Sequence, residues 1–541
     1  MSDAAGAAGA PAPSGASLPY PGLRRQGIGE LVARSAARCP EKTALVYGPQ
    51  RYSYRELDAT INGAAGALAA HGLARGDRVA LLSHNNDAWV VLFFALARLG
   101  VISVPINFML NAAEVAYILE HCTARGLIVE DRLRGIAEAA LGRARTQITL
   151  RAVICQGRAP VPPGWDDVAQ WLRAASAPGA PVTVAEEEPI QIMYTSGTES
   201  RPKGATLSSR NYLAQYLSCI VDLEAGADDV DLHPMPLYHC AQLHAFLSPG
   251  LFLGSTNVLL PAADPAQILA AIERERVTRL FCPPTVWIGL LQHADFGARD
   301  LTSLTKGYFG ASAMPTEVIR ELARRLPALE LFNCYGQTEM APLTTVLKPR
   351  DQLRKLGSVG RPVVNVETRI VDDEDRPVPA GTVGEIVHRG PQVMLGYWKD
   401  ADQSAAAFRN GWFHSGDLGV FDQEGFLRVV DRKKDMIKCG GENVASREVE
   451  EVLYQHPDVA EAAVVGVPDP RWIEAVAAAV VLRPRAGVTP GGLIGFCRER
   501  LAGYKTPKRI VLLERLPKNA SGKILKRELR AQLAAAPDAQ G

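Results

Sequence analysis

Short apolar runs alternate with amphipathic patterns along much of this chain, and this alternation constrains its fold most. Val79–Leu82 has the composition of a strand, the pattern from Asp87 to about Leu99 predicts a helix capped by Asp87, and Val101–Val104 predicts the next strand. The same order returns at residues 111–130 and 257–282. Strands that are joined through helices pair in parallel, and the helices cover the faces of the sheet. We therefore predict an α/β fold with a large N-terminal region of parallel, helix-covered sheets.

The pattern changes twice towards the C-terminus. Val366–Val371 and Gly384–His388, separated by turn residues, predict the antiparallel strands of a small β-rich subdomain. After Asp431, the order of helices and strands predicts a compact α+β unit. A chain of 541 residues is too long for a single hydrophobic core. We expect an N-terminal domain at residues 27–431 and a C-terminal domain at residues 432–541, after a disordered tail at residues 1–26 that is rich in Ala, Gly, Pro and Ser.

Composition argues against several partners and compartments. The net charge is +1, so no overall field attracts nucleic acid or an anionic membrane. The nine cysteines are scattered and form no Cys-x-x-Cys pair, which favours a reducing compartment. The most apolar stretch, Ala88–Pro105, contains Arg98 and Gly100, whereas a membrane span needs ~20 uninterrupted apolar residues. The N-terminus lacks the basic start and apolar block of a signal peptide, so we expect a cytoplasmic protein with no transmembrane segment and no nucleic-acid partner.

A loop rich in hydroxyl groups, Tyr194–Gly204, follows the predicted strand at Ile190–Met193. Backbone N–H groups and hydroxyls in such a loop donate hydrogen bonds to phosphates, and a lysine offsets their charge. It is not a Walker A loop, because Pro202 interrupts the required spacing after the glycine. Composition alone leaves an ordinary turn open as the alternative. The candidate phosphate ligands are Thr195, Ser196, Gly197, Thr198 and Lys203.

Four further segments follow this loop in a fixed order: Tyr335–Glu339, Trp412–Gly419, Asp431–Asn443 and Pro517–Lys523. Together with the loop, they resemble the signature blocks of the adenylate-forming superfamily, which includes acyl-CoA synthetases, beetle luciferases and the adenylation domains of peptide synthetases. The resemblance covers the chain from about Gly27 to about Leu533. It implies that the small C-terminal domain is mobile.

The resemblance also implies a two-step reaction that uses ATP, Mg²⁺ and CoA. A carboxylate attacks the α-phosphate of ATP to give an acyl-adenylate and pyrophosphate, and the thiol of CoA then displaces AMP. Two anions must meet in the first step, so the site has to supply positive charge and oriented donors.

The family pattern assigns roles to the block at Tyr335–Glu339. The ring of Tyr335 stacks on adenine, Thr338 donates to the α-phosphate, and Glu339 holds Mg²⁺. His239 matches a position that gates the acyl pocket and helps to steer the carboxylate. The remaining residues matched to the nucleotide and acyl site are Gly310, Ala311, Ser312, Gly336 and Gln337.

The later blocks match the ribose contacts and the hinge. The Asp417 carboxylate can accept one hydrogen bond from each of two ribose hydroxyls, and Arg432 matches a second ribose contact. Lys434 occupies the hinge position, about which the C-terminal domain of family members rotates between adenylation and thioester formation.

Four residues of the C-terminal domain match the chemistry of the two steps. Gly440 and Gly441 lie where the pantetheine arm of CoA passes the backbone, which only glycine allows. Lys438 faces the same site in the second arrangement. Lys523 matches the lysine of the first step, whose ammonium bridges the carboxylate and the α-phosphate.

Enzymes of the superfamily that use acetate have a bulky tryptophan at the position of Gly336, so glycine here predicts room for a larger group. The predicted pocket wall carries no Lys or Arg to pair with a second carboxylate; it consists of residues 239–244, Trp287, residues 310–314 and residues 336–341. Medium- or long-chain fatty acids are therefore the first choice of substrate, and aryl acids are the second.

Other functions stay open from the sequence. A free-standing ligase that loads a carrier protein, a luciferase-like oxygenase and a nucleotide-binding regulatory protein are the alternatives, and a homodimer is also open. The only hint of a lost activity is Glu199-Ser200, which stands where the family pattern has a hydroxyl and a glycine.

Overall fold

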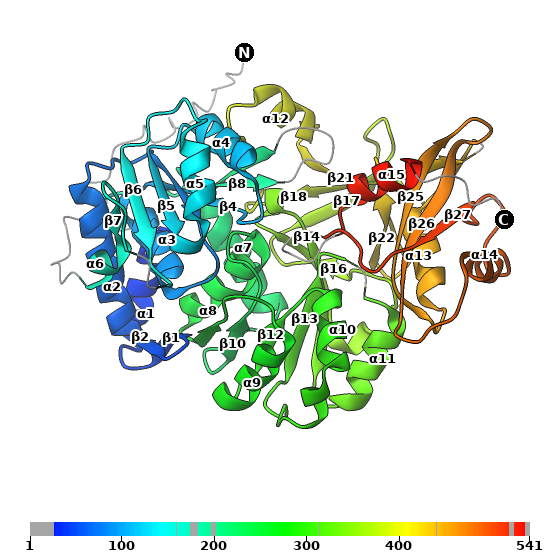
Figure 1. The fold of residues 1–541 in the computed structure, drawn as a ribbon, viewed down its shortest axis with the longest axis horizontal. Helices are drawn as coiled ribbons and strands as arrows, with labels where there is room; N and C mark the ends of the chain where they lie inside the picture. Colours follow the sequence, from blue (N-terminus) through cyan, green and yellow to red (C-terminus); the bar gives the residue numbers. More distant parts are fainter. Residues whose placement is uncertain are drawn as a thin grey trace, which may run out of the picture.

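The computed structural model describes residues 26–157, 160–173, 182–195, 202–312, 314–439, 441–518 and 524–535. The expected disordered tail at residues 1–26 lies outside these ranges apart from its last residue. Four β-sheets with covering helices make up the described part of the chain (Figure 1).

The first sheet has the order β16-β15-β14-β13-β12-β10-β11-β1-β2. Its central strands pair in parallel, while β15, β16 and β2 are antiparallel to their neighbours. The bounds are β1 Thr43–Tyr47, β2 Gln50–Ser53, β10 Val230–His233, β11 Thr256–Leu259, β12 Arg279–Phe281, β13 Lys306–Gly310, β14 Glu330–Gly336, β15 Leu343–Leu347 and β16 Arg361–Pro362.

The second sheet has the order β19-β9-β8-β4-β3-β5-β6-β7. Parallel strands β4, β3, β5 and β6 continue into the antiparallel hairpin of β8 and β9, whose connection carries the predicted phosphate loop. The bounds are β3 Arg78–Leu82, β4 Ile102–Ile106, β5 Gly126–Glu130, β6 Leu150–Ile154, β7 Asp166–Asp167, β8 Pro189–Thr195, β9 Lys203–Ser208 and β19 Gly396–Tyr397.

Helices cover both large sheets, and the main hydrophobic core lies between the two sheets. In β3, Val79 and Leu81 point into this core, whereas Ala80 and Leu82 point to the other face, which explains why the whole strand is apolar. The helix bounds are α1 Leu31–Arg38, α2 Tyr54–Ala70, α3 Asp87–Leu99, α4 Ala112–His121, α5 Arg134–Leu141, α6 Val168–Arg173, α7 Ser209–Asp222, η3 (a π-helix) Ala241–Leu247, α8 Ser248–Leu253, α9 Pro265–Glu275, α10 Pro284–Gln292, α11 Thr316–Arg325 and α12 Ala401–Ala407. Short 3₁₀ turns are η1 Ile28–Glu30, η2 Asp131–Leu133, η4 Ala294–Gly297, η5 Thr338–Met340 and η6 Pro349–Asp351.

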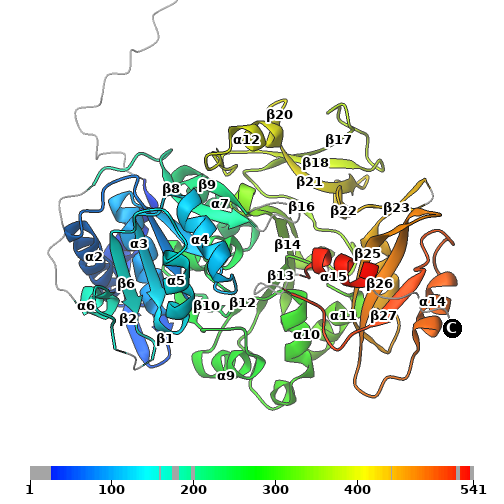
Figure 2. The same cartoon turned by 45° about the horizontal axis from the view of Figure 1, so that its top comes forward.

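The third sheet is antiparallel, and the fourth sheet belongs to the C-terminal part of the chain (Figure 2). The third consists of β17 Glu367–Val371, β18 Gly384–Arg389, β20 Phe408–Arg409, β21 Trp412–Phe421 and β22 Leu427–Arg432. The fourth consists of β23 Ile437–Cys439, β24 Glu442–Val444, β25 Val459–Asp469, β26 Ile473–Leu482 and β27 Arg509–Leu512. Helices α13 Ser446–Tyr454 and α14 Pro490–Arg498 pack on one face of it, and α15 Lys526–Ala535 packs on the other.

These sheets confirm the predicted fold class of parallel, helix-covered sheets, a β-rich subdomain and a smaller C-terminal α+β unit. The boundary after residue 431 and the mobility of the last unit stay predictions. One local prediction was wrong: Asp87 is the first residue of α3, and the cap is Asn86, whose side chain accepts the Trp89 N–H at 2.8 Å. Within the described ranges, no helix has the length and apolar character needed to cross a membrane.

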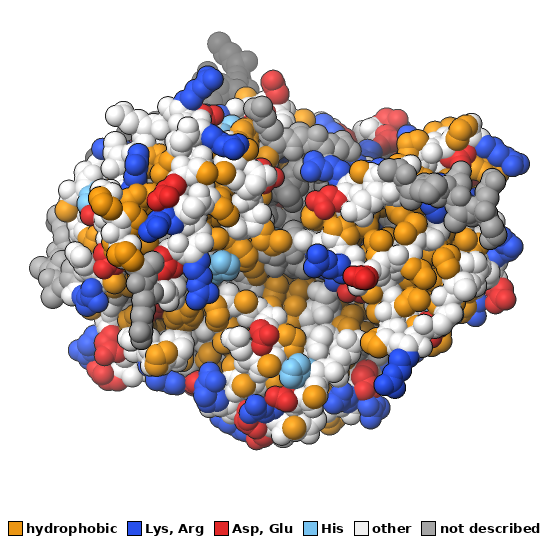
Figure 3. Space-filling view, viewed as in Figure 1, with side chains coloured by type: hydrophobic (Ala, Val, Ile, Leu, Met, Phe, Trp, Pro, Cys, Tyr) orange, Lys and Arg blue, Asp and Glu red, His pale blue; other side chains and the backbone are white. Residues whose placement is uncertain are grey.

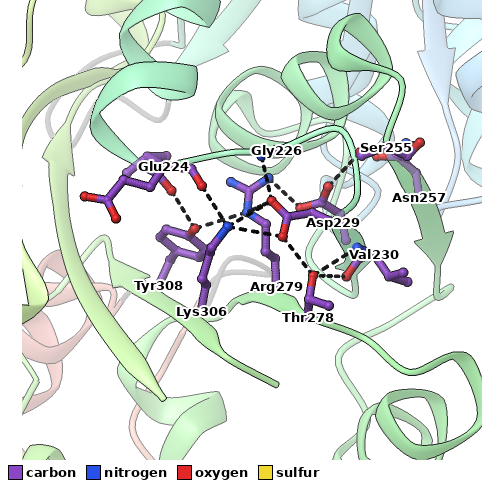
Figure 4. A network of polar contacts seen from close by, with 12 residues as sticks. Glu224, Gly226, Asp229, Val230, Ser255, Asn257, Thr278, Arg279, Lys306 and Tyr308 are labelled. Atoms are coloured by element: carbon purple, nitrogen blue, oxygen red, sulfur yellow. Dashed lines mark hydrogen bonds and ion pairs between the residues drawn. The ribbon is translucent and has the colours of Figure 1, made fainter. Parts of the chain in front are cut away.

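A buried ionic network ties together the starting ends of β10, β12 and β13 (Figure 4). Arg279, only 1% exposed, lies 2.7 Å from Asp231 and donates to the Tyr308 hydroxyl at 3.1 Å. Asp229 accepts from Lys306 at 3.1 Å and from the Thr278 hydroxyl at 3.0 Å. This network therefore braces the first sheet at the edge opposite to the carboxyl ends of these strands.

Candidate active site

The carboxyl ends of β13 and β14 lie side by side and are kept free of side chains by glycine. Gly310 is paired with Cys334, and a Cβ atom on Gly310 would lie 2.4 Å from the Cys334 carbonyl oxygen. A Cβ atom on Gly336 would lie 1.8 Å from the carbonyl oxygen of Pro342. Both contacts are with backbone, so only glycine permits this approach of the strands and the following turn.

On one side of β14, Tyr335 reaches the third sheet. Its hydroxyl donates to Asp417 at 2.7 Å, and the guanidinium of Arg432 lies 3.4 Å from the other oxygen of that carboxylate. Asp417 and Arg432 are direct partners in the β21–β22 ladder. Burial, together with Asp417, raises the pKa of Tyr335 well above its usual value, so its hydroxyl stays a donor. The structure thus brings together three residues that the sequence assigned to adenosine.

On the other side of the same turn, Thr338 meets the loop before η3. The Thr338 hydroxyl lies 3.3 Å from the sulfur of Cys240, and Cys240 follows His239 in the chain. The backbone N–H of Ala241 donates to Nδ1 of His239 at 3.3 Å. Burial raises the pKa of Cys240 to about 12, so this thiol is neutral and acts as a small packing group beside Thr338.

Glu339 is joined to the base of the phosphate loop through Tyr397. The Tyr397 hydroxyl donates to Glu339 at 2.9 Å, and the ammonium of Lys203 lies 5.2 Å from the centre of the same ring. Lys203 is paired with Thr195 across the β8–β9 hairpin. The arrangement places a cation and a carboxylate on two sides of one tyrosine, beside the connection that carries the predicted phosphate ligands.

Several other predicted site residues follow β13 and β14 or belong to the phosphate loop. Ala311 and Ser312 are exposed after β13, and Ala311 has a positive φ of 66°. Nε2 of Gln337 is buried and has no hydrogen-bond partner among the described residues. Ser196, Gly197 and Thr198 lie outside the described residues.

The predicted residues of the C-terminal part follow β22. Lys434 is exposed in the turn between β22 and β23, Lys438 is exposed on β23, and Gly441 has a φ of 90° in the next turn. Gly440 and Lys523 lie outside the described residues. The roles assigned to these five residues stay predictions.

Two expected members of the acyl-pocket wall are packed in the interior instead. Trp287 is fully buried in the outer core of the first sheet, where Nε1 donates to the Tyr308 carbonyl at 3.1 Å. His244 is also fully buried; its ring stacks on Tyr212 at 3.6 Å, and burial holds its pKa well below the usual value. The sequence analysis expected both in the pocket wall, but both side chains are enclosed by packed residues.

The residues fit a magnesium ion that is shared with phosphates. Glu339 is a single carboxylate with one oxygen used by Tyr397, and Mg²⁺ in nucleotide sites is bound by one or two carboxylates together with substrate phosphates and water. When bound, the ion would neutralise part of the phosphate charge.

One residue of this site was missed from the sequence: Tyr397 connects Lys203 to Glu339. Cys240 lay within the pocket wall expected at residues 239–244, but its contact with Thr338 was not foreseen. Tyr397 carries no spacing signal, since its role arises from the pairing of β19 with β9.

Comparison with known proteins shows the family to which this chain belongs. The family of AMP-binding enzymes matches residues 32–398, and the C-terminal domain of AMP-binding enzymes matches residues 448–523. A feruloyl-CoA synthase from Amycolatopsis sp is 38% identical over 94% of this chain and 99% of its own length. An indoleacetate–CoA ligase from Aromatoleum aromaticum is also 38% identical, over 94% of this chain and 98% of its own.

Two further matches extend the comparison. A long-chain-fatty-acid–CoA ligase from Mycobacterium tuberculosis is 33% identical over 94% of this chain and 99% of its own. The solved structure of an anthranilate CoA ligase in complex with anthranoyl-AMP has a TM-score of 0.87 at 29% identity and covers 94% of this chain and 98% of its own. The chain therefore belongs to the AMP-binding enzyme family within the adenylate-forming superfamily.

Proposed function

We propose that the protein is an AMP-forming acid–CoA ligase that activates a hydrophobic carboxylic acid through an acyl-adenylate. One observation carries this proposal: three residues of a single turn reach three different surroundings. Tyr335 reaches Asp417, Thr338 reaches Cys240 next to His239, and Glu339 reaches Tyr397. A ribose, a carboxylate and a triphosphate would therefore meet at this turn, as adenylation requires.

The residues around this turn would have separate roles. Asp417 and Arg432 would bind the ribose, with Tyr335 fixing the carboxylate. Thr338 would donate to the α-phosphate while His239 steers the acid. Lys203 would offset phosphate charge, and such preorganised donors and cations lower the barrier for two anions that must react.

The C-terminal domain would turn about Lys434 and bring Lys523 to the reacting groups in the first step. One hydrogen bond spans the segment that contains Lys434: the Asp431 carboxylate accepts the Ser446 N–H at 2.6 Å at the start of α13. A rotation at Lys434 would have to break this contact, because the two residues lie on opposite sides of the hinge. In the second arrangement, Lys438, Gly440 and Gly441 would line the path of CoA.

The acid is proposed to be an aryl or arylalkanoic acid, with a fatty acid as the second candidate. The relatives at 38% identity are named for feruloyl and indoleacetate groups, whereas the fatty-acid ligase is at 33%. This reverses the order expected from the sequence, which had no measure of the depth of the pocket.

The test is release of pyrophosphate over a panel of aryl and alkyl acids, with and without CoA. We expect acid-dependent pyrophosphate and CoA-dependent AMP. Pyrophosphate without consumption of CoA would favour a ligase that loads a carrier protein. Absence of pyrophosphate with every acid would favour a nucleotide-binding regulatory protein and refute the proposal.

The role of Lys523 has its own test. Lys523→Ala should abolish formation of the adenylate, while chemically prepared acyl-adenylate still reacts with CoA, because the lysine is expected to act in the first step only. Lys526→Ala is the matched control, since Lys526 contacts Glu450 at 2.8 Å within the C-terminal domain. Equal loss of both steps in Lys523→Ala would contradict this role.

A further inference from the structure

The inner faces of β13 and β14 define a column of side chains below the candidate active site. Successive residues of a strand point to opposite faces, so Gly310 and Tyr308 share one face of β13, and Gly336, Cys334 and Phe332 share one face of β14. Tyr308 and Phe332 belong to the core between the two large sheets, whereas Phe309 belongs to the core on the opposite face. Phe246 of η3, the π-helix that follows His239, approaches this column at Tyr308, with the ring centres 5.1 Å apart.

The upper part of this column has small side chains. Gly336 and Gly310 contribute none, and Cys334 is partly exposed. In η3, the small side chains are Ala241, which is partly exposed and packs against this core, and Ala245, which is buried within it. At ~3.3 Å per residue, the distance from Gly336 to Phe332 along β14 is about 13 Å, which sets the depth of this small-residue region.

A continuous layer of aromatic rings closes the column at that depth. Phe246 of η3 stacks on Phe281 of β12 at 4.6 Å and lies 5.1 Å from Tyr308. Tyr308 in turn stacks on Phe332 at 4.9 Å. The most exposed of these four side chains is Phe281 at 6%, so the layer leaves no open passage through it.

Tyr308, one of the four rings of this layer, is held in place by the buried ionic network. The Tyr308 hydroxyl donates to the Leu223 carbonyl at 2.7 Å and accepts from Arg279 at 3.1 Å. The Arg279 guanidinium also lies 5.1 Å from the centre of the Tyr308 ring (Figure 4). To pass this layer, an acyl chain would have to break a buried charge network, which is far more costly than moving an apolar side chain.

Phe246 is the member of the layer most able to vary. The other three rings are on strands of the braced sheet, while Phe246 is on η3, a π-helical turn. Such turns are rare and are found frequently at functional sites. Figure 3 shows that the middle of the molecule's face is hollowed between the N-terminal part and the C-terminal domain.

We propose that Phe246, Phe281, Tyr308 and Phe332 form the floor of the acid-binding pocket and that Phe246 sets its depth. The enzyme then takes compact acids, a planar ring on a short spacer, and rejects long alkyl chains. This inference rests on the proposed function, because it names the acid that the ligase activates.

The experiment compares Phe246→Leu and Phe246→Ala with wild-type protein over straight-chain acids of increasing length and a set of aryl acids. Phe309→Leu and Phe309→Ala are the matched controls, because they remove an equally buried ring from the opposite face of the same sheet. Pyrophosphate release gives kcat/KM, calorimetry gives binding of each acid without turnover, and thermal unfolding shows that each variant is folded.

We expect wild-type protein to prefer aryl acids. The Phe246 variants should improve long acids relative to aryl acids by about 10- to 200-fold, the range for a change in fit of one pocket group. The Phe309 variants should keep the wild-type order of acids. The same length limit in the folded Phe246 and Phe309 variants, or a wild-type preference for long chains, would overturn the inference.

The two failures are distinguishable. If no acid yields pyrophosphate, the proposed function is wrong, and calorimetry still decides whether Phe246 limits the length of the acids that bind. If pyrophosphate forms but the length profile is unchanged by Phe246→Leu and Phe246→Ala, only the floor is wrong.

Discussion

The hydrogen bond from Tyr335 to Asp417 allows a quantitative test of the nucleotide site. Tyr335→Phe removes only the hydroxyl, which donates to the carboxylate at 2.7 Å. A hydrogen bond to a charged group contributes about 1.5–3 kcal/mol. Asp417 keeps Arg432 at 3.4 Å, so the carboxylate stays in place with less defined orientation. We expect kcat/KM for ATP to fall by roughly 10- to 150-fold, which is the same free energy expressed as a ratio.

A double-mutant cycle with Asp417→Asn separates a shared role from two independent ones. If Tyr335 acts through Asp417, the double variant should be no worse than Asp417→Asn alone, which gives a coupling free energy of about 1.5–3 kcal/mol. The assay is acid-dependent exchange of pyrophosphate into ATP at varied ATP. Tyr47→Phe is the control, because the Tyr47 hydroxyl donates to Gln156 at 3.0 Å. Additive losses would refute the reasoning, as would an unchanged kcat/KM for ATP in Tyr335→Phe.

Three further predictions concern stability, reactivity and shape. Arg279→Met should lower the free energy of unfolding, measured by denaturant titration, by about 3–5 kcal/mol, because Asp231 stays buried without its partner. Burial already raises the pKa of Asp231, so this loss of stability should shrink as the pH falls and Asp231 takes up a proton. A loss that does not depend on pH would contradict this cause. Because its pKa is raised to about 12, the Cys240 thiol should resist iodoacetamide at neutral pH in the folded protein and react after unfolding. Peptide mass spectrometry measures this labelling. Rapid labelling of the folded protein would exclude a buried neutral thiol. Gly336→Ala should reduce turnover of every acid by about a hundredfold, because its Cβ atom would displace the turn at Pro342; a selective gain for short acids would instead support simple filling of the pocket.

The last of these predictions concerns the position at which enzymes of the superfamily that use acetate have a tryptophan. From the resemblance, glycine at this position predicts room for a larger acyl group. In this structure the first carbon of any side chain there would lie 1.8 Å from a backbone oxygen, so the substitution would move the turn that carries Thr338 and Glu339. Backbone crowding of this kind depends on the path of the next turn, which the local sequence does not specify.

The order of elements was predictable because it depends on periodicity and turn residues. The strand at Val79–Leu82 and the helix ending at Leu99 are present as β3 and α3, within one residue of their predicted bounds. The helix cap was placed one residue late because Asn86 and Asp87 are both good capping residues, and only the backbone geometry separates them.

Motifs located the turn at Tyr335–Glu339 but not its neighbours. Tyr397 lies far from that turn in the sequence and reaches Glu339 only because β19 pairs with β9. The burial of individual side chains was also not predictable from the sequence: Trp287 and His244 were expected in the pocket wall, yet both are packed in hydrophobic cores. The depth of the acid pocket likewise depends on the stacking of Phe246 with Phe281, which no local pattern encodes.

Alternate side chains of β14 face two different surroundings. Tyr335 projects towards the third sheet and its carboxylate, while Phe332 and Cys334 project towards η3. On the proposed function, substitutions at Phe332 or Cys334 would therefore change which acid is accepted and leave Tyr335 and Asp417 in place. A one-residue slip of this strand would exchange the side chains that face these two surroundings, so insertions here should be tolerated far less than substitutions.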